Sequence, residues 1–354
     1  MGSRERLLEA LDWQRRGMER PSPLYARLLD AVITDVETGG PCARLLGDPP
    51  PDPVADASVL RFLGGVHRIV LDGRAPALAA FYPSAGGRYD AGADDPVPAF
   101  LDTVAAHVEE LTAALGHPVQ TNEVARCAAL LPGFLAVAVA SGLPLRVLEV
   151  GASAGLNLRW DHYRYEGGAD GSVFGDPASP LRFDDVYRDP RPRLAGMATV
   201  AERRGCDRAP IDAQSHDGRM TLRSFVWPDQ GLRYAHLDAA LEVARDVPVV
   251  IDRADAAEWV ATQLSRPADG AATVVFHSIV WQYFSAETKR GMKDAIVTAG
   301  VDATADAPIA WLRFEPAPDP TKGVDVSVRL WPGGRERVLI RSGYHGKPVR
   351  VAAP

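Results

Sequence analysis

The residues whose types and spacing best suit chemistry lie at positions 149–155, where Glu149 precedes Gly151-Ala152-Ser153-Ala154-Gly155. The pattern G-x-S-x-G is typical of the sharp turn that presents a nucleophilic serine in α/β-hydrolases. An acid followed by a glycine-rich turn also fits a loop that holds the polar part of a nucleotide cofactor, because glycine lets backbone amides approach a ligand closely. The two hypotheses differ in whether Ser153 or Glu149 contributes to function.

The hydrolase hypothesis requires several strands before the nucleophile and an acid and a histidine after it. Before residue 145 we find only one weak strand candidate, HRIVLDG (67–73). The candidate partners, none of which the sequence singles out, are Asp252 or Asp255 with His277 or His345. We therefore rank a Ser153 hydrolase below the cofactor loop.

The cofactor hypothesis depends on Glu149. A strand that ends in an acid, with the glycine loop opening a helix, would place bare backbone N–H groups near a ligand. A carboxylate there would repel a pyrophosphate but would suit the ammonium and hydroxyl groups of S-adenosylmethionine. Two simpler interpretations stay open: Ser153 as the N-cap of the next helix, and Glu149 as the ion-pair partner of Arg146 or Arg159.

Short β-rich runs from Leu145 onward predict the strands that would position this loop. They alternate with amphipathic stretches, which indicates a parallel sheet covered on both faces; the runs are LRVLEVG (145–151), VPVVID (247–252), ATVVFHS (272–278) and PIAWLRFE (308–315). VDVSVRLW (324–331) alternates strictly and is followed by a Pro-Gly-Gly turn and RVLIRS (337–342). The pattern predicts a C-terminal antiparallel hairpin.

The first part of the chain has apolar residues at helical spacing, as in 7–11, 24–32 and 101–111. The stretch from Cys127 to Leu145 carries no charge. Pro132 and Gly133 interrupt it, so we interpret it as a helix buried against the sheet rather than a membrane span. We predict a helical N-terminal region over 1–144 and a Rossmann-like α/β domain over 145–354.

The composition excludes several partners and sites. A formal net charge of -7 gives no overall attraction to nucleic acids or anionic membranes. Three scattered cysteines and the lack of an apolar leader segment predict a cytoplasmic protein without a disulfide framework. We expect no metal site, because no ligand spacing is present and His216-Asp217-Gly218 fits a hairpin turn.

The region from about 145 to 345 resembles the class I S-adenosylmethionine-dependent methyltransferases, whose parallel sheet ends in one reversed strand. The whole chain also resembles the bacterial domain of unknown function 2332 family. The stretches that carry this second resemblance are SPLYARLL, HRIVLDGRAPALAAFYPS, TNEVARCAALLPG, LEVGASAGLNLRWDHYRY, GDPASPL, RRGCDRAPID, RSFVWPDQ and FHSIVWQYFS.

The methyltransferase resemblance implies a role for each matching residue. The loop of Gly151, Ala152, Ser153 and Gly155 would lie under the methionine part of S-adenosylmethionine, and Glu149 would reach its amino group. Asp207, after a second strand at 198–203, would bind the ribose hydroxyls. Asp255, with Asp252 as its rival, would bind the adenine. The spacing between Glu149 and Asp207 requires an insertion around 165–195.

Methyl transfer mainly requires that the acceptor be aligned and, where necessary, deprotonated. His277, at the end of the fourth strand, is the candidate base, and Tyr283 and Trp281 would shape a pocket for an unknown small-molecule acceptor. His277 could equally be a hydrogen-bonded interior histidine, and Asp207 and Asp255 could be turn or cap residues. The TNEVAR segment (121–126) could face the cofactor or cap a helix.

Two further functions stay open beside an enzyme of this kind. One is a non-catalytic protein with the same fold, acting as a ligand sensor or a partner subunit. The other is the Ser153 hydrolase. The sequence does not predict the oligomeric state.

Overall fold

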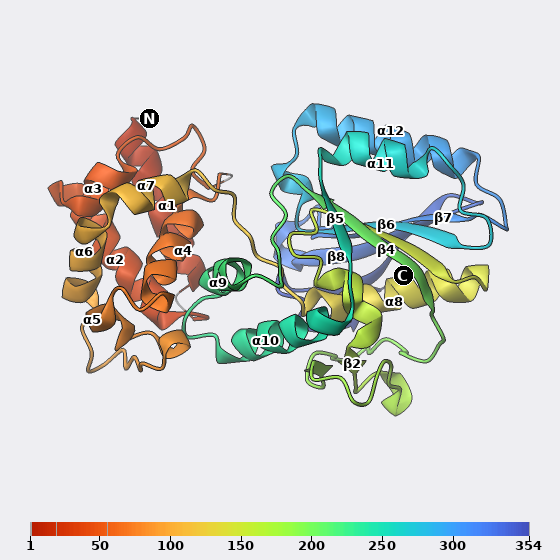
Figure 1. The fold of residues 1–354 in the computed structure, drawn as a ribbon, viewed down its shortest axis with the longest axis horizontal. Helices are drawn as coiled ribbons and strands as arrows, with labels where there is room; N and C mark the ends of the chain where they lie inside the picture. The colour runs from red at the N-terminus through yellow and green to blue at the C-terminus, as the bar shows by residue number, and fades with distance from the viewer. Residues whose placement is uncertain (1, 19, 55, 354) are drawn as a thin grey trace. The chain divides into compact units, whose positions relative to one another are not determined.

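The computed structural model describes residues 2–18, 20–54 and 56–353, which form two compact units (Figure 1). The first unit consists of Met1–Thr121 and Ser215–Ala235, and the second of Asn122–Gln214 and His236–Pro354. This division differs from the predicted boundary at residue 144 in two places. Residues 122–144 belong to the second unit, and the segment 215–235 returns to the first.

The first unit is helical, as its spacing predicts. Its elements are α1 (Ser3–Met18), α2 (Pro23–Thr38), α3 (Pro41–Leu46), α4 (Ser58–Leu71), α5 (Pro76–Ala79), the 3-10 helix η1 (Pro83–Ala85), α6 (Val97–Ala106), α7 (Val108–Leu115) and α9 (His216–Ser224). Helix α10 (Gly231–Asp246) begins in this unit and continues into the second. Buried Leu, Val and Phe side chains from α1, α2, α4 and α6 form one core.

Two local predictions in this unit are wrong. The strand candidate HRIVLDG lies in α4, because Phe62, Val66 and Ile69 recur at helical spacing and all face the core. His216-Asp217-Gly218 forms the first turn of α9 rather than a hairpin turn. Ser215 is the N-cap of that helix, and its hydroxyl accepts a hydrogen bond from the Gly218 amide at 2.9 Å.

The second unit contains an eight-stranded sheet in the order β10-β9-β8-β7-β6-β1-β4-β5. The strands are β1 (Leu145–Val150), β4 (Val200–Asp207), β5 (Val250–Arg253), β6 (Ala272–Ser278), β7 (Ile309–Pro316), β8 (Val324–Trp331), β9 (Arg335–Ser342) and β10 (Val349–Val351). Strands β5, β4, β1, β6 and β7 are parallel, which confirms the mostly parallel sheet.

The antiparallel C-terminal strands are also confirmed, with one difference. Each of β8, β9 and β10 is antiparallel to its predecessor, so β8 and β10 both run against the parallel strands. The methyltransferase resemblance implied one reversed strand. The third C-terminal strand is only three residues long and has no alternating pattern of its own, so periodicity did not indicate it.

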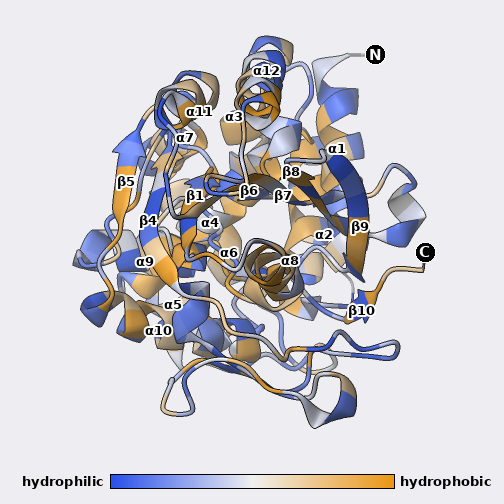
Figure 2. Cartoon of the chain, turned by 90° about the vertical axis from the view of Figure 1, so that its right-hand side faces the viewer, coloured by the Kyte–Doolittle hydropathy of each residue, from blue (hydrophilic) through white to orange (hydrophobic). Residues whose placement is uncertain are grey.

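Helices cover both faces of the sheet, as Figures 1 and 2 show. Helix α8 (Arg126–Ser141) packs against β6, β7, β8 and β9, which confirms the buried uncharged helix. Helices α11 (Ala256–Leu264) and α12 (Ala286–Val301) pack against each other on the opposite face. In the described part of the chain, no helix is both long and apolar enough to span a bilayer.

The connection from β1 to β4 holds the predicted insertion. It contains the 3-10 helices η2 (Asn157–His162) and η3 (Ala169–Gly171) and the short strands β2 (Arg164–Tyr165) and β3 (Arg182–Phe183), which form a separate two-stranded sheet. Trp160 of η2 stacks on Phe134 of α8, with ring centroids 4.3 Å apart. This contact attaches the segment after the glycine loop to the core.

Candidate functional site

The candidate site lies at the carboxyl ends of β1, β4 and β6. From β1 the chain continues to β4 and β5 on one side and then returns to β6 on the other side of β1. Val150 accordingly pairs with Cys206 on β4 and with His277 on β6. In open α/β sheets, ligands bind outside the strand carboxyl ends where the strand order reverses in this way.

The loop after β1 has a backbone that favours glycine. Gly151, Ser153 and Gly155 have φ angles of 70°, 53° and 66°. A side chain on Gly151 would also meet Val280, since an added Cβ would lie 2.6 Å from its Cγ2. Both predicted loop glycines are therefore required by the local fold, and Ser153 adopts a left-handed conformation that is uncommon for serine.

The sequence predicted that the loop amides are free to contact a ligand and that the loop begins a helix. Both parts of this prediction are wrong. Gly151 and Ala152 donate to the Cys206 carbonyl at 2.9 and 3.0 Å, and the Ser153 amide donates to Asp207 Oδ2 at 2.8 Å. The next element is the six-residue η2, whose N-cap is Leu156 rather than Ser153. Because β4 supplies acceptors to the amides of Gly151, Ala152 and Ser153, these three amides are used within the protein.

Glu149 is the most unusual titratable group of the site. Its side chain is 1% exposed, and its Oε2 has no hydrogen-bond partner among the described residues. Burial raises the pKa of Glu149 well above its ordinary range, and the nearby Asp207 charge raises this pKa further. A hydrogen bond from the Asn157 side chain and the charges of Arg126 and Arg159 oppose the rise.

The predicted ion-pair alternatives for Glu149 have other partners. Arg146 pairs with Glu202 at 2.9 Å and donates to the Gln263 carbonyl at 3.0 Å. Arg159 donates to the carbonyls of Val247 and Gly155, both at 2.8 Å. Arg159 therefore supports the loop backbone, and its charge acts on Glu149 without a direct hydrogen bond.

The structure places Asp207 beside the loop, because β4 extends to this residue rather than ending at 203. Its two oxygens accept from the amides of Ser153 and Ala209, both at 2.8 Å. Each carboxylate oxygen has two lone pairs, so the group can still accept two hydrogen bonds from a ligand.

Asp252 and Asp255 differ in how many hydrogen bonds their carboxylates already accept within the protein. Asp252 accepts from the Arg204 guanidinium at 2.7 and 2.9 Å and from Trp259 Nε1 at 2.7 Å, and Arg204 lowers its pKa. Asp255 is the N-cap of α11 and accepts from the Ala257 amide at 2.9 Å. Its second oxygen has a long contact, 3.4 Å, with the Thr288 hydroxyl. Asp255 therefore has more capacity for a ligand.

His277 is an interior histidine with both ring nitrogens engaged. It is 0% exposed; its Nδ1–H donates to Glu315 Oε1 at 2.6 Å, and its Nε2 accepts from Trp311 Nε1 at 3.1 Å. The ring also stacks on Trp281, with centroids 5.4 Å apart. Tyr283 is different, since it lies in η4 (Trp281–Tyr283) and is 51% exposed.

Sequence reasoning missed Glu315, at the carboxyl end of β7. Its Oε1 also accepts from the amides of Val280 and Trp281 at 3.1 and 3.3 Å, whereas its Oε2 is buried and has no partner in the described part of the chain. The available signal was an acid at a strand end, the same signal that singled out Glu149.

Asn157 and two TNEVAR residues complete the surroundings of the loop. Asn157 Oδ1 accepts from the Cys127 thiol at 3.2 Å, which leaves its amide nitrogen for Glu149. Asn122 Oδ1 accepts from the Leu156 amide at 2.9 Å, and Arg126 donates to the Ser278 carbonyl at 3.0 Å. These two TNEVAR residues therefore support the site rather than only capping a helix.

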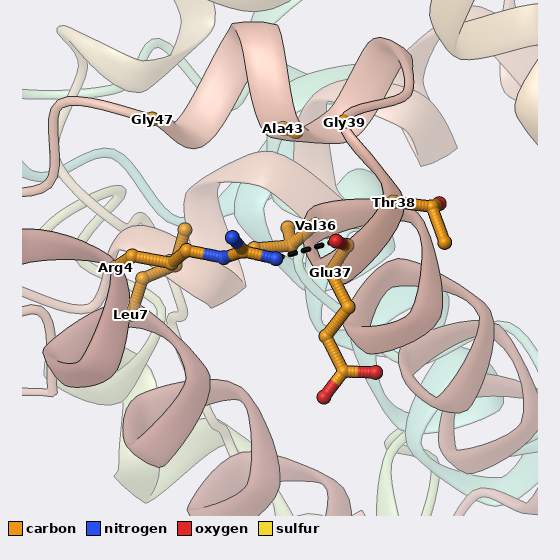
Figure 3. Close-up of a pocket in the computed structure, with 8 residues that line it drawn as sticks. All are labelled: Arg4, Leu7, Val36, Glu37, Thr38, Gly39, Ala43 and Gly47. Carbon is orange, nitrogen blue, oxygen red and sulfur yellow. Dashed lines mark hydrogen bonds between the residues drawn. The ribbon is translucent and has the colours of Figure 1, made fainter.

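The described first unit contains a separate pocket of about 340 Å³ (Figure 3). Residues of α1, α2 and α3 form its wall, where Arg4 donates to the Glu37 carbonyl. None of the candidate residues above lines this pocket. Its polar side chains are those of surface residues, so it adds no catalytic group.

The comparisons with known proteins identify a family but no activity. The family described as "Uncharacterized protein conserved in bacteria (DUF2332)" matches residues 9–350. No curated protein matches the chain. No solved structure matches it either.

Proposed function

We propose a function for this chain, which belongs to the DUF2332 family of uncharacterised bacterial proteins, from the chemistry at the carboxyl end of its sheet. The chain binds S-adenosylmethionine beside Glu149 and transfers its methyl group to a small-molecule acceptor. The observation that carries the proposal is Glu149, a buried acid at the switch point of the sheet with one carboxylate oxygen that has no partner among the described residues.

A buried carboxylate oxygen without a donor is costly, and the free-energy penalty is removed when a ligand supplies the donor. An ammonium group does this best, because it also neutralises the charge. The amino group of S-adenosylmethionine has this chemistry. Asp207, which retains acceptor capacity next to the loop, suits the ribose hydroxyls, and Asp255 suits the adenine amino group.

On the acceptor side, His277 has the geometry of a base oriented by a carboxylate, since Glu315 accepts from its Nδ1–H. Bound S-adenosylmethionine supplies a methyl group already activated by a sulfonium. The protein's part is then to align the acceptor and to take its proton at His277 Nε2, with Tyr283 as an acceptor contact. For that step the 3.1 Å hydrogen bond from Trp311 to Nε2 must open.

The Trp311 hydrogen bond also favours a second candidate function, in which the protein binds the ligand without turnover. The two candidates differ in whether labelled methyl groups from S-adenosylmethionine reach small molecules of a bacterial extract. Transfer that is lost in His277→Gln supports the enzyme. Ligand binding without any transfer supports the sensor or partner subunit.

Calorimetric titration with S-adenosylhomocysteine tests the binding proposal. We expect saturable binding to the intact protein and at least about 30-fold weaker binding to Glu149→Gln, which corresponds to losing one partner of a buried charge pair. Glu202→Gln is the matched control, because Glu202 pairs with Arg146 at the other end of the same strands and should leave affinity unchanged.

The glutamine is close in shape and uncharged, so Glu149→Gln should melt no lower than the intact protein. Absence of binding to the intact protein, or equal affinity in Glu149→Gln, would contradict the proposal.

A further inference from the structure

The first unit contains a serine–histidine pair that the proposed function does not use. His67 of α4 is 0% exposed, and two segments distant in sequence contact its ring. Its Nε2 lies 2.7 Å from Ser84 Oγ, and its Nδ1 lies 3.1 Å from the Ser224 carbonyl oxygen. All three residues belong to the same unit, so the arrangement is internal to it.

The hydrogen bonds determine where the protons are. A carbonyl oxygen only accepts, so Nδ1 carries the hydrogen and Nε2 presents its lone pair to the Ser84 hydroxyl. The Tyr234 hydroxyl is also 3.1 Å from Nε2, but it lies closer, at 2.7 Å, to the Arg223 carbonyl, to which it donates. The Ser84 proton is therefore directed at the imidazole, as in a nucleophile–base pair oriented by a third group.

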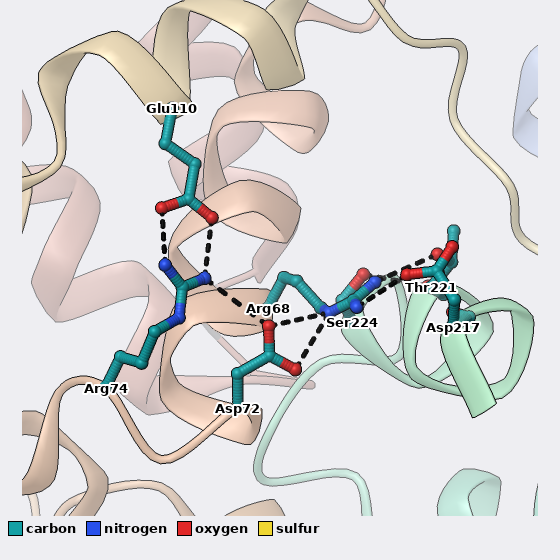
Figure 4. Close-up of polar contacts among 7 residues, drawn as sticks. All are labelled: Arg68, Asp72, Arg74, Glu110, Asp217, Thr221 and Ser224. Atoms are coloured by element: carbon teal, nitrogen blue, oxygen red, sulfur yellow. Dashed lines mark hydrogen bonds and ion pairs between the residues drawn. The ribbon is translucent and has the colours of Figure 1, made fainter.

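A set of ion pairs holds the orienting carbonyl in place (Figure 4). Arg68, next to His67 on α4, pairs with Asp72 at 3.0 Å and reaches α9 through Asp217 at 2.7 Å and the Thr221 hydroxyl at 3.2 Å. The packing is close, because a Cβ on Gly64 would lie 2.9 Å from Phe225. Arg68 thus joins the first part of α9 to α4, and Phe225 packs against α4 directly after Ser224, which supplies the carbonyl.

Ser84 and His67 differ in their access to solvent. Ser84 lies in η1 and is half-buried, and its neighbours Pro83 and Ala85 are exposed. The imidazole behind it is sealed from solvent. Ser84 is therefore partly accessible to solvent, whereas the base stays in a dry environment.

Tyr82 provides the remaining polar group. Its hydroxyl is buried and has no hydrogen-bond partner among the described residues, and its ring centroid lies 5.3 Å from that of His67. The amides of residues 84–87 donate to carbonyl oxygens of the protein. The Tyr82 hydroxyl, two residues before Ser84 in the chain, is thus a donor that is not used within the described part of the chain and is available to an oxygen that becomes negatively charged.

We propose that Ser84 is a nucleophile activated by His67 and that the first unit carries an acyl-transfer site for small activated esters. Ser84 Oγ forms a bond to the acyl carbon while its proton passes to His67 Nε2. The carbon–oxygen bond to the leaving alcohol breaks, and the alcohol takes that proton. Water then attacks the Ser84 ester, again losing its proton to Nε2, and the proton returns to Ser84 Oγ as the acid leaves.

The burial of His67 also predicts the rate of this reaction. Burial lowers the pKa of His67 to about 3, so the imidazole is uncharged at neutral pH and available as an acceptor. So weak a base transfers protons slowly, since the best catalytic pKa is close to the working pH. We therefore expect slow acylation by activated esters and fluorophosphonates rather than cleavage of amides.

Labelling of the full chain with a fluorophosphonate probe, located by mass spectrometry, tests the proposal. In this reaction Ser84 Oγ bonds to phosphorus, fluoride leaves, and His67 takes the proton. We expect a single adduct on Ser84 that is absent from Ser84→Ala. Ser265→Ala, which changes an exposed serine outside both sites, is the matched control and should label at the rate of the intact protein.

Two further variants separate catalysis from folding. His67→Gln should label at least about 100-fold more slowly, as expected for loss of a base. Tyr82→Phe removes only the hydroxyl; it should keep the melting temperature and slow labelling by about 100-fold or more. Absence of labelling in the intact protein, or labelling at Ser153 instead of Ser84, would overturn the proposal. It would also be overturned if Tyr82→Phe labels at the rate of the intact protein and the adduct is still formed in Ser84→Ala.

Discussion

The affinity of the protein for S-adenosylhomocysteine is expected to rise with pH, by at most about tenfold for each pH unit, until the pH reaches the raised pKa of Glu149. The cause is Glu149, whose pKa is raised well above its ordinary range by burial and, secondarily, by Asp207. In the ligand-free protein the group is therefore protonated below that raised pKa. Only the carboxylate can pair with the ligand's ammonium group, so binding must release one proton.

The direction of this effect follows from the raised pKa. As the pH rises towards the folded-state pKa of Glu149, the ionised fraction grows and the cost of removing the proton falls; above that pKa the affinity should level off. Calorimetry in buffers of different ionisation enthalpy measures the released proton directly. Glu149→Gln should bind weakly and without this pH dependence. Affinity that rises as the pH falls would show that Glu149 does not meet the ammonium.

Replacing Trp160 by alanine is expected to lower the free energy of unfolding by about 3–5 kcal/mol. Trp160 is 0% exposed and stacks on Phe134 and on Phe174, with ring centroids 4.3 and 5.8 Å away. Its indole nitrogen has no hydrogen-bond partner in the described part of the chain, so the lower stability comes from lost packing contacts. Urea unfolding followed by circular dichroism measures the change.

Two matched variants make the Trp160 result specific. Trp13→Ala removes the same side chain from a position that is 60% exposed and should change stability by less than about 0.5 kcal/mol. Trp160→Phe keeps an aromatic ring against Phe134 and should recover most of the loss. If Trp160→Ala and Trp13→Ala unfold at the same urea concentration, the stacked cluster does not hold η2 and the loop before it.

The strands that the sequence predicted best are those whose pattern is local. VDVSVRLW alternates, and ATVVFHS is an unbroken β-rich run, so both were located from their own residues. HRIVLDG is also β-rich, but its apolar residues continue a helical spacing that starts at Val59. There the tertiary core, which buries one face of α4, decided the structure rather than the intrinsic preference of the residues.

The site was predictable in its position but not in its hydrogen bonds. An acid at the end of a central strand was enough to single out Glu149. The hydrogen bonds of the loop amides could not be predicted from the sequence, because their acceptors, Cys206 and Asp207, lie more than fifty positions away along the chain. The same holds for His277, whose partners Trp311 and Glu315 come from the next strand.

Binding of S-adenosylmethionine beside Glu149, at the carboxyl end of β1, is the proposal on which the other residue roles depend. A crystal structure of the full chain grown with S-adenosylhomocysteine tests it most directly. We predict the ligand's amino group within about 3 Å of Glu149 Oε2, and the ribose on the Asp207 side of the loop. Ligand density at another place, or an unchanged Glu149 pocket in crystals grown at saturating ligand, would contradict the claim.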